Sequence, residues 1–176
     1  MSPNLIQQLS ASYPVAFIQA LGRVLQNEGG LSETPGDEGG ETKYGISQRQ
    51  YPSLDIAALT LPDAAAIYYH DWWMKFNFSA LAGAIGAKAF DLSVNMGPRS
   101  AIICLQRAIR ACGREVPDDG DLGPVTMNAA RAIEAALLLA AFRSEAAGHY
   151  RLLAGGDNAA GSNHKFLTGW LNRAYE

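Results

Sequence analysis

The chain has 176 residues, of which 48% are hydrophobic and 18% charged, a composition typical of a compact enzyme with one core or two small abutting cores. Its formal net charge of -3 gives no electrostatic reason to expect a nucleic-acid partner. The same charge argues against a strongly cationic protein that disrupts membranes, and we expect a monomer without stable membrane insertion.

The first 22 residues contain neither a basic leading segment nor a long apolar core, so we expect neither a secretory signal nor a membrane anchor. The most apolar stretch, residues 129–153, is interrupted by charged residues: Arg131, Glu134, Arg143 and Glu145. This stretch therefore predicts a core helix and not a membrane span.

A helix is predicted from Pro14 up to Gly29-Gly30, because proline suits a first helical turn and paired glycines suit a stop. Its apolar residues recur at three-and-four spacing and mark one buried face: Phe17, Leu21, Val24 and Leu25. Glu28 lies on that face at the helix end. Partial burial and the helix C-terminus both disfavour its charged form and raise its pKa, as a general acid requires.

An acidic, glycine-rich segment follows. The run Asp37-Glu38-Gly39-Gly40 predicts a tight turn, and residues 41–46 predict one short strand of a hairpin. A hairpin folded back over the helix end would bring Asp37 and Thr42 towards Glu28. Glycoside hydrolysis needs such a grouping, with a protonated carboxyl beside a second group that steadies water or positive charge. A calcium loop is the competing interpretation, but the acidic spacing does not fit an EF-hand.

Residues 62–73 predict a helix that Pro62 opens and that carries an aromatic cluster. Adjacent Trp72 and Trp73 cannot face one way on a helix, so we select Tyr69 and Trp73 as the pair able to line a sugar-binding cleft. Core packing is the competing interpretation and the default one for such a cluster. Tyr44, in the hairpin, is a further candidate sugar contact.

Further helices are predicted at residues 99–111, 123–153 and 166–175, with a turn at residues 117–120. Gly83 and Gly86 are expected to interrupt the apolar run around residues 81–90. Asn95 either binds an N-acetyl group of a sugar or caps the helix that begins near Pro98.

Cys104 and Cys112 lie eight residues apart on one predicted helix, too far along its axis to form a disulfide. They are interpreted as two buried thiols, which fits synthesis in a reducing compartment. No grouping of His, Cys and Asp has zinc-ligand spacing, so we expect neither a metal nor a cofactor.

Ordered motifs cover the chain from about residue 15: Glu28-Gly29-Gly30, Asp37-Glu38-Gly39-Gly40-Glu41-Thr42-Lys43-Tyr44-Gly45-Ile46, Asp91-Leu92-Ser93-Val94-Asn95-Met96-Gly97-Pro98, Leu105-Gln106, Asp119-Gly120, Gly123-Pro124-Val125-Thr126 and Lys165-Phe166-Leu167-Thr168-Gly169-Trp170. This series resembles glycoside hydrolase family 108, the muramidases found as phage endolysins and secretion-activator proteins. The spacer with Glu33 and Pro35, and the acidic run at residues 118–121, depart from the family pattern.

The resemblance implies a mainly α, lysozyme-like helical fold with a small β-hairpin after the first long helix. It implies a catalytic region at residues 1–90 and a helical, peptidoglycan-binding-like region at residues 91–176, packed as one unit with the first. Glu28 would be the catalytic acid. The order of Glu28, Asp37 and Thr42 also looks like that of the catalytic residues of phage-type lysozymes. This likeness implies that Asp37 and Thr42 hold the attacking water.

The implied partner is the glycan strand of bacterial peptidoglycan, cleaved at the β-1,4 bond between N-acetylmuramic acid and N-acetylglucosamine. Without a signal, the protein would be made in the cytoplasm and reach the wall through a holin, a secretion route or cell lysis. Two alternatives stay open. A lytic transglycosylase would use the same Glu28, and a non-catalytic peptidoglycan-binding or secretion-accessory protein would need none of the Glu28, Asp37 and Thr42 grouping.

Overall fold

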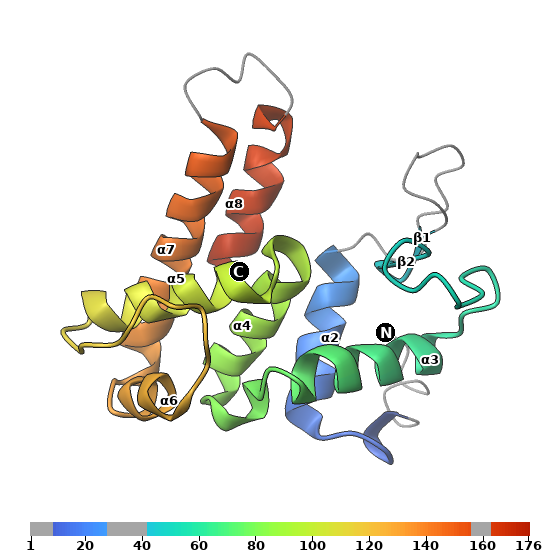
Figure 1. Ribbon diagram of the computed structural model, residues 1–176, viewed down its shortest axis with the longest axis horizontal. Coiled ribbons are helices and arrows are strands. Elements are labelled where there is room, and N and C mark those ends of the chain that lie inside the picture. Colours follow the sequence, from blue (N-terminus) through green and yellow to red (C-terminus); the bar gives the residue numbers. More distant parts are fainter. Residues whose placement is uncertain (1–8, 28–41, 156–162) are drawn as a thin grey trace. The chain divides into compact units, whose positions relative to one another are not determined.

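The computed structural model describes residues 9–27, 42–155 and 163–176 of the chain (Figure 1). Glu28, Asp37 and the turn predicted at residues 37–40 lie outside the described residues. The chain divides into two compact units, Met1–Lys75 and Phe76–Glu176. The division predicted near residue 90 lies within a helix of the second unit and stays a prediction.

The first unit contains α2, Val15–Asn27, where the sequence predicted a helix. All four residues of its predicted apolar face are buried: Phe17, Leu21, Val24 and Leu25. The three-and-four periodicity is therefore confirmed. Asn27, the last residue of α2, directly precedes Glu28 in the sequence.

The hairpin consists of β1, Thr42–Lys43, and β2, Ile46–Ser47, which pair antiparallel with Lys43 opposite Ile46. Its turn is Tyr44-Gly45, and both residues have positive φ, 55° and 78°, as a two-residue type I′ turn requires. The prediction that residues 41–46 form one strand is wrong, because Gly45 adopts the left-handed conformation readily and reverses the chain inside that run.

After the hairpin, α3 spans Leu61–Ile67. The Thr60 hydroxyl accepts a hydrogen bond from the backbone N–H of Asp63, and the Asp63 carboxylate accepts one from the backbone N–H of Thr60. This capping box satisfies two of the free N–H groups at the helix start. The hydrogen bonds from Thr60 also lower the pKa of Asp63. Pro62 lies in the first turn, as predicted.

The helix continues as η1, a π-helix over Tyr68–Met74. The α-helical spacing expected for its aromatic residues is therefore wrong. A π-helix bonds residue i to residue i+5, and Tyr68 and Trp73, five positions apart, are both buried, at 1% and 2% exposure. Short π-helical segments occur frequently at functional sites.

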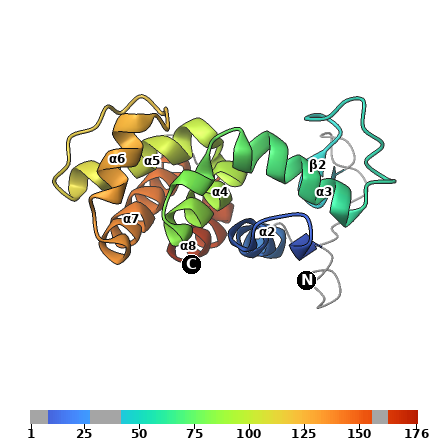
Figure 2. The same ribbon diagram turned by 90° about the horizontal axis from the view of Figure 1, so that it is seen from below.

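The second unit contains the other described elements: η2 (Phe78–Ala80), α4 (Gly83–Met96), α5 (Pro98–Ala111), α6 (Pro124–Arg131), α7 (Ala135–Ala154), η3 (His164–Phe166) and α8 (Leu167–Tyr175). Helix α5 packs against α4 and α7, and α7 and α8 lie side by side (Figure 1 and Figure 2). The helices predicted at residues 99–111 and 166–175 are confirmed. Because the hairpin holds all of the β-structure in the described residues, the mainly α fold class is confirmed as well.

The single helix predicted over residues 123–153 is wrong, since α6 ends at Arg131 and α7 begins at Ala135. The Glu134 carboxylate caps α7 by accepting hydrogen bonds from the backbone N–H groups of Ala136, at 2.9 Å, and Leu137, at 2.8 Å. These bonds lower the pKa of Glu134. An acidic cap starts a new helix here because it satisfies N–H groups that have no partner within the helix.

Gly83 and Gly86 do not interrupt the apolar run, because both lie inside α4. At Gly86 the backbone of η2 passes so close that a Cβ would lie 2.4 Å from the carbonyl oxygen of Phe78. Glycine is therefore required at Gly86 for the approach of η2 to α4.

The motif residues of the α5–α6 segment meet in one buried polar network around Gln106, which is 0% exposed. Its Nε2 donates to the Asp119 carboxylate at 2.7 Å, to the Asp121 carbonyl at 3.0 Å and to the Thr126 hydroxyl at 3.2 Å. Its Oε1 accepts from the backbone N–H of Gly120 at 2.9 Å. One side chain thus joins α5, the turn at Gly120 and the first turn of α6.

A buried charge cluster joins α4 to α8. The Asp91 carboxylate, on α4, accepts a hydrogen bond from Nε of Arg173 at 3.2 Å, and its second oxygen lies 3.6 Å from Nζ of Lys88. Lys88 also donates to the Arg173 carbonyl at 2.7 Å. Burial lowers the pKa of Lys88, while the charge of Asp91 acts in the opposite direction.

Both cysteines are free, but only Cys104 is buried and Cys112 is half-buried, so the prediction of two buried thiols is wrong for Cys112. Burial raises the pKa of the Cys104 thiol to about 11. Across the described ranges, the helices are all too short or too polar to cross a membrane.

Replacement of Gly86 by alanine should destabilise the second unit. The new methyl group would meet the Phe78 carbonyl at 2.4 Å, and overpacking of this kind costs about 1–3 kcal/mol. Urea denaturation should show this fall in the free energy of unfolding. Gly148→Ala, in α7, is the matched control because its Cβ meets nothing within 4 Å, and it should stabilise the protein by about 0.4–1 kcal/mol. Equal effects of the two substitutions would contradict the close-approach argument.

Gln106→Leu should lower the free energy of unfolding by about 1–3 kcal/mol, because leucine removes the acceptor of the Gly120 N–H and the hydrogen bond that the buried Thr126 hydroxyl accepts. The neighbouring Arg107→Gln is the control. It breaks only an exposed ion pair with Asp118, which is worth about 0–1 kcal/mol. Thermal and urea unfolding of both variants measure the difference, and a Gln106→Leu protein as stable as the wild type would contradict the network's role.

Candidate functional site

The described structure contains five of the seven residues predicted for the site: Thr42, Tyr44, Tyr69, Trp73 and Asn95. Glu28 and Asp37, the two predicted carboxylates, lie outside the described residues. The first four of the five belong to the first unit, and Asn95 belongs to the second.

Thr42 is exposed at the start of β1, and the hairpin that carries it is held at two points. The Tyr68 hydroxyl, from η1, donates a hydrogen bond to the Tyr44 carbonyl at 3.0 Å. Nζ of Lys43 donates to the Ala57 carbonyl at 2.8 Å. The first of these bonds ties the turn of the hairpin to the π-helix, so Thr42 and Tyr44 stand in a defined place relative to η1.

Tyr44 is half-buried and has a left-handed backbone, with φ of 55°. This conformation is uncommon for a residue with a side chain. It is imposed by the two-residue turn and sets the direction in which the ring leaves the hairpin. Nζ of Lys43 lies 5.9 Å from the centre of that ring. An aromatic face beside a cation can contact a sugar.

Tyr69 and Trp73 have different surroundings. Tyr69 is half-buried, with its ring 4.9 Å from that of Tyr13 and 5.0 Å from that of Phe17. Trp73 is 2% exposed and packs edge-on against Phe17 at 5.7 Å. The Trp73 ring therefore contacts protein in this structure, and Tyr69 is the member of the pair that retains an exposed part.

A carboxylate that the sequence reasoning missed lies on η1 beside these aromatic residues. The Tyr51 hydroxyl donates a hydrogen bond to the exposed Asp71 carboxylate at 2.8 Å. Burial, followed by this hydrogen bond and the charge of Asp71, raises the pKa of Tyr51 to about 12. Asp71 is thus an oriented acceptor that can take a hydrogen bond from a sugar hydroxyl. Tyr51 lies twenty residues before it, so no local pattern identifies the pair.

Asn95 lies exposed in the last turn of α4 and accepts a hydrogen bond from the buried Tyr150 hydroxyl at 2.8 Å. The alternative in which Asn95 caps the next helix is wrong, because Gly97 is the N-cap of α5. Tyr150 in turn stacks on Trp170 of α8, with 5.4 Å between the ring centres. Asn95 is therefore positioned by the α4, α7 and α8 packing of the second unit.

The part of the chain that the structure describes contains no group of three or more His, Cys, Asp or Glu residues able to hold a metal ion. Among the described residues of the first unit, the groups that the sequence and the contacts single out are the Thr42 hydroxyl, the Asp71 carboxylate and the Tyr44 and Tyr69 rings. These groups suit the recognition of a polar, ring-shaped ligand.

Comparison with known proteins agrees with this chemistry. The family model described as glycosyl hydrolase 108 matches residues 21–97, and the one described as a predicted peptidoglycan domain matches residues 100–175. Among solved structures, the chain is similar to Brucella abortus SagA, with a TM-score of 0.63 and 22% identity over 91% of this chain and 96% of that chain. At that identity the likeness shows a shared fold. No curated protein matches the sequence.

The two family matches confirm the resemblance drawn from the ordered motifs. They support a glycoside hydrolase-type enzyme whose partner is peptidoglycan and whose place of action is the cell wall. Residues 21–97 of the chain are therefore similar to the glycosyl hydrolase 108 family, and residues 100–175 are similar to a predicted peptidoglycan domain.

Proposed function

We propose that the protein is an N-acetylmuramidase that cleaves the β-1,4 bond between N-acetylmuramic acid and N-acetylglucosamine, with Glu28 as the general acid. The observation that carries the proposal is the position of Glu28 within the glycosyl hydrolase 108 match, directly after the amphipathic helix α2. Val24, four residues before Glu28 in the sequence, is 0% exposed. A carboxyl group that follows such a buried face is suited to keep its proton near neutral pH.

In this reaction Glu28 gives its proton to the glycosidic oxygen as the bond to the anomeric carbon breaks. Asp37 and the Thr42 hydroxyl hold a water molecule that attacks the opposite face of the sugar, with Asp37 accepting the proton of the water. Direct attack by water inverts the configuration at the anomeric carbon. The exposure of Thr42 and the two hydrogen bonds that anchor its hairpin support this assignment.

The glycan strand contacts Tyr44 and Tyr69 through their partly exposed rings and the Asp71 carboxylate through sugar hydroxyl groups. Asn95, exposed on the second unit, binds an N-acetyl group. Trp73 is left out of this set because it is 2% exposed, and its role is to hold η1 against α2 through Phe17. The protein reaches the wall through a holin, a secretion route or lysis of the producing cell.

Glu28→Gln should keep the fold and reduce cleavage of purified cell walls by about 10²–10⁴-fold, because the amide has no proton to transfer. Glu115→Gln is the control, since Glu115 is an exposed acidic residue of the second unit. Turbidity clearing and release of reducing ends measure the rate, and circular dichroism checks the fold. A Glu28→Gln enzyme with near-normal activity would exclude Glu28 as the acid.

Asp37→Ala and Thr42→Ala should each slow hydrolysis strongly while the affinity for non-cleaved glycan changes little, because both groups act on the attacking water. Mass spectrometry and NMR of the wild-type digest should show a reducing-end muramic acid of inverted configuration. A 1,6-anhydro product would instead identify a lytic transglycosylase. Wall binding with no cleavage products at all would identify a non-catalytic binding protein.

A further inference from the structure

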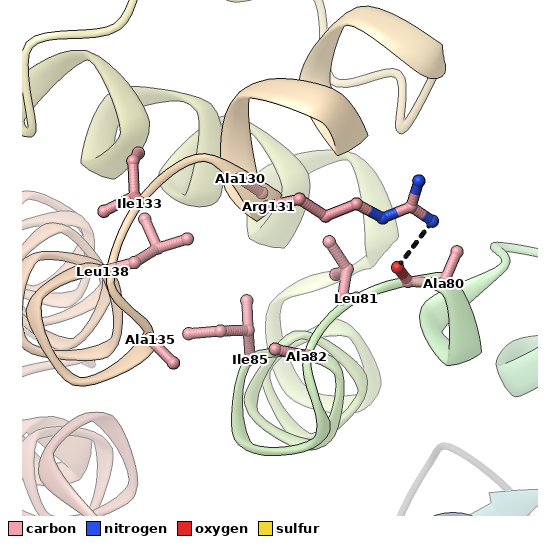
Figure 3. Close-up of a pocket in the computed structure, with 9 residues that line it drawn as sticks. All are labelled: Ala80, Leu81, Ala82, Ile85, Ala130, Arg131, Ile133, Ala135 and Leu138. Atoms are coloured by element: carbon pink, nitrogen blue, oxygen red, sulfur yellow. Dashed lines mark hydrogen bonds between the residues drawn. The ribbon is translucent and has the colours of Figure 1, made fainter.

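The second unit contains a pocket of about 410 Å³ between the start of α4 and the α6–α7 junction (Figure 3). Nine residues line it: Ala80, Leu81, Ala82, Ile85, Ala130, Arg131, Ile133, Ala135 and Leu138. Its volume lies at the small end of the range of about 300–1,000 Å³ found for ligand pockets. It can therefore hold a short segment of a ligand but not a long polymer chain.

The lining combines aliphatic side chains with a single cation. The side chains of Leu81, Ile85 and Leu138 point towards the same space, and Arg131 extends past them to one end (Figure 3). A terminal nitrogen of Arg131 donates to the Ala80 carbonyl at 3.1 Å. That bond uses one of the five N–H donors of the exposed guanidinium. The planar fork of the remaining donors matches a carboxylate.

Two features of the backbone build the walls. The close approach at Gly86 holds Phe78 of η2 against α4, and this places Ala80 and Ala82 on one side. On the other side, the break between α6 and α7 turns Ile133 and Ala135 towards the pocket. The pocket is thus part of the packed unit. It also combines both family matches, since residues 80–85 lie in the hydrolase match and residues 130–138 in the peptidoglycan match.

We propose that this pocket binds the alanyl carboxyl end of a peptidoglycan stem peptide, with its methyl groups among the aliphatic residues and its carboxylate on Arg131. The inference rests on the proposed function, because peptidoglycan supplies the ligand. A stem peptide ends in alanine residues, which are small and apolar. The last of them carries a free carboxylate. A sugar fits this site poorly, because sugars are bound by aromatic faces and by many hydrogen bonds, and none of the nine lining residues is aromatic.

One nearby charge opposes an anionic ligand. Glu134 lies between the lining residues Ile133 and Ala135. Its two carboxylate oxygens are engaged by the N–H groups of Ala136 and Leu137. The positive end of the α7 dipole offsets its charge there. Arg131 therefore remains the charged group that a carboxylate in the pocket would meet.

The test uses the full-length Glu28→Gln protein, in which cleavage of the comparison glycan chitotetraose should be slow, and isothermal titration calorimetry with synthetic acetyl-Lys-D-Ala-D-Ala. Arg131→Gln should weaken binding about tenfold or more, since it removes a charge-assisted hydrogen bond. The C-terminal amide of the same peptide should bind the unmodified pocket as weakly as the free acid binds the Arg131→Gln variant. The affinity of this amide should fall little further with Arg131→Gln, because amidation of the peptide and replacement of Arg131 remove the same interaction. Arg151→Gln, an exposed arginine of α7 outside the pocket, should leave the affinity unchanged.

A second pair of variants tests the aliphatic part of the pocket. Ala135→Leu fills the space with a larger side chain and should abolish peptide binding. Ala136 is exposed, follows Ala135 in the sequence and does not line the pocket, so Ala136→Leu should leave peptide binding unchanged. Absence of peptide binding to the intact pocket, or equal losses from Arg131→Gln and Arg151→Gln, would overturn the proposal. So would loss of chitotetraose binding with the same pocket variants, which would make this a glycan site.

Wall cleavage by the wild-type protein is measured separately, so that the two proposals can fail independently. If peptide binding depends on Arg131 but the protein does not cleave glycan, the peptide-binding proposal is supported and the muramidase proposal is overturned. If the protein cleaves glycan but does not bind the peptide, the muramidase proposal is supported and the peptide-binding proposal is overturned.

Discussion

The buried carboxylate of Asp91 is the constraint on which the second unit depends. An ionised group 3% exposed is costly to bury unless it is paired, and here Lys88 and Arg173 both reach it. Because Arg173 is in α8 and Lys88 also binds the Arg173 carbonyl, the last helix is held in register with α4. Removal of one partner would weaken the compensation of this buried charge. The cluster thus joins residues 82 positions apart in the sequence.

The packing of α4 explains why the two ways of dividing this chain disagree. By family, α4 lies in the glycosyl hydrolase 108 match, which ends at residue 97. By packing, it belongs to the unit that starts at Phe76, where it contacts α5 and α7. The last helix of the hydrolase match is therefore built into the core of the peptidoglycan region. A pocket lined by both matches follows from this arrangement, as does the position of Asn95, which α4 carries and Tyr150 of α7 holds.

The first unit places its candidate sugar contacts in a different manner. A π-helix carries Tyr69 and Asp71, and the hydrogen bond from Tyr68 to Tyr44 attaches the hairpin to it. Three motif residues of the second unit, Gln106, Gly120 and Thr126, have by contrast a structural role. They satisfy each other's polar groups in the interior.

The sequence by itself determined the features that depend on neighbours along the chain. Periodicity predicted α2, α5 and α8, and the ordered motifs predicted the match to glycosyl hydrolase 108 over residues 21–97. The reversal at Tyr44-Gly45 and the Glu134 cap before Ala135 also have local causes, which the sequence analysis did not recognise, whereas tertiary structure decided the packing of the π-helix. It also decided the Tyr51–Asp71 pair and the burial of Trp73. The physical reason is that buried aromatic rings and paired charges find their partners only when distant segments pack together, so local propensity does not specify them.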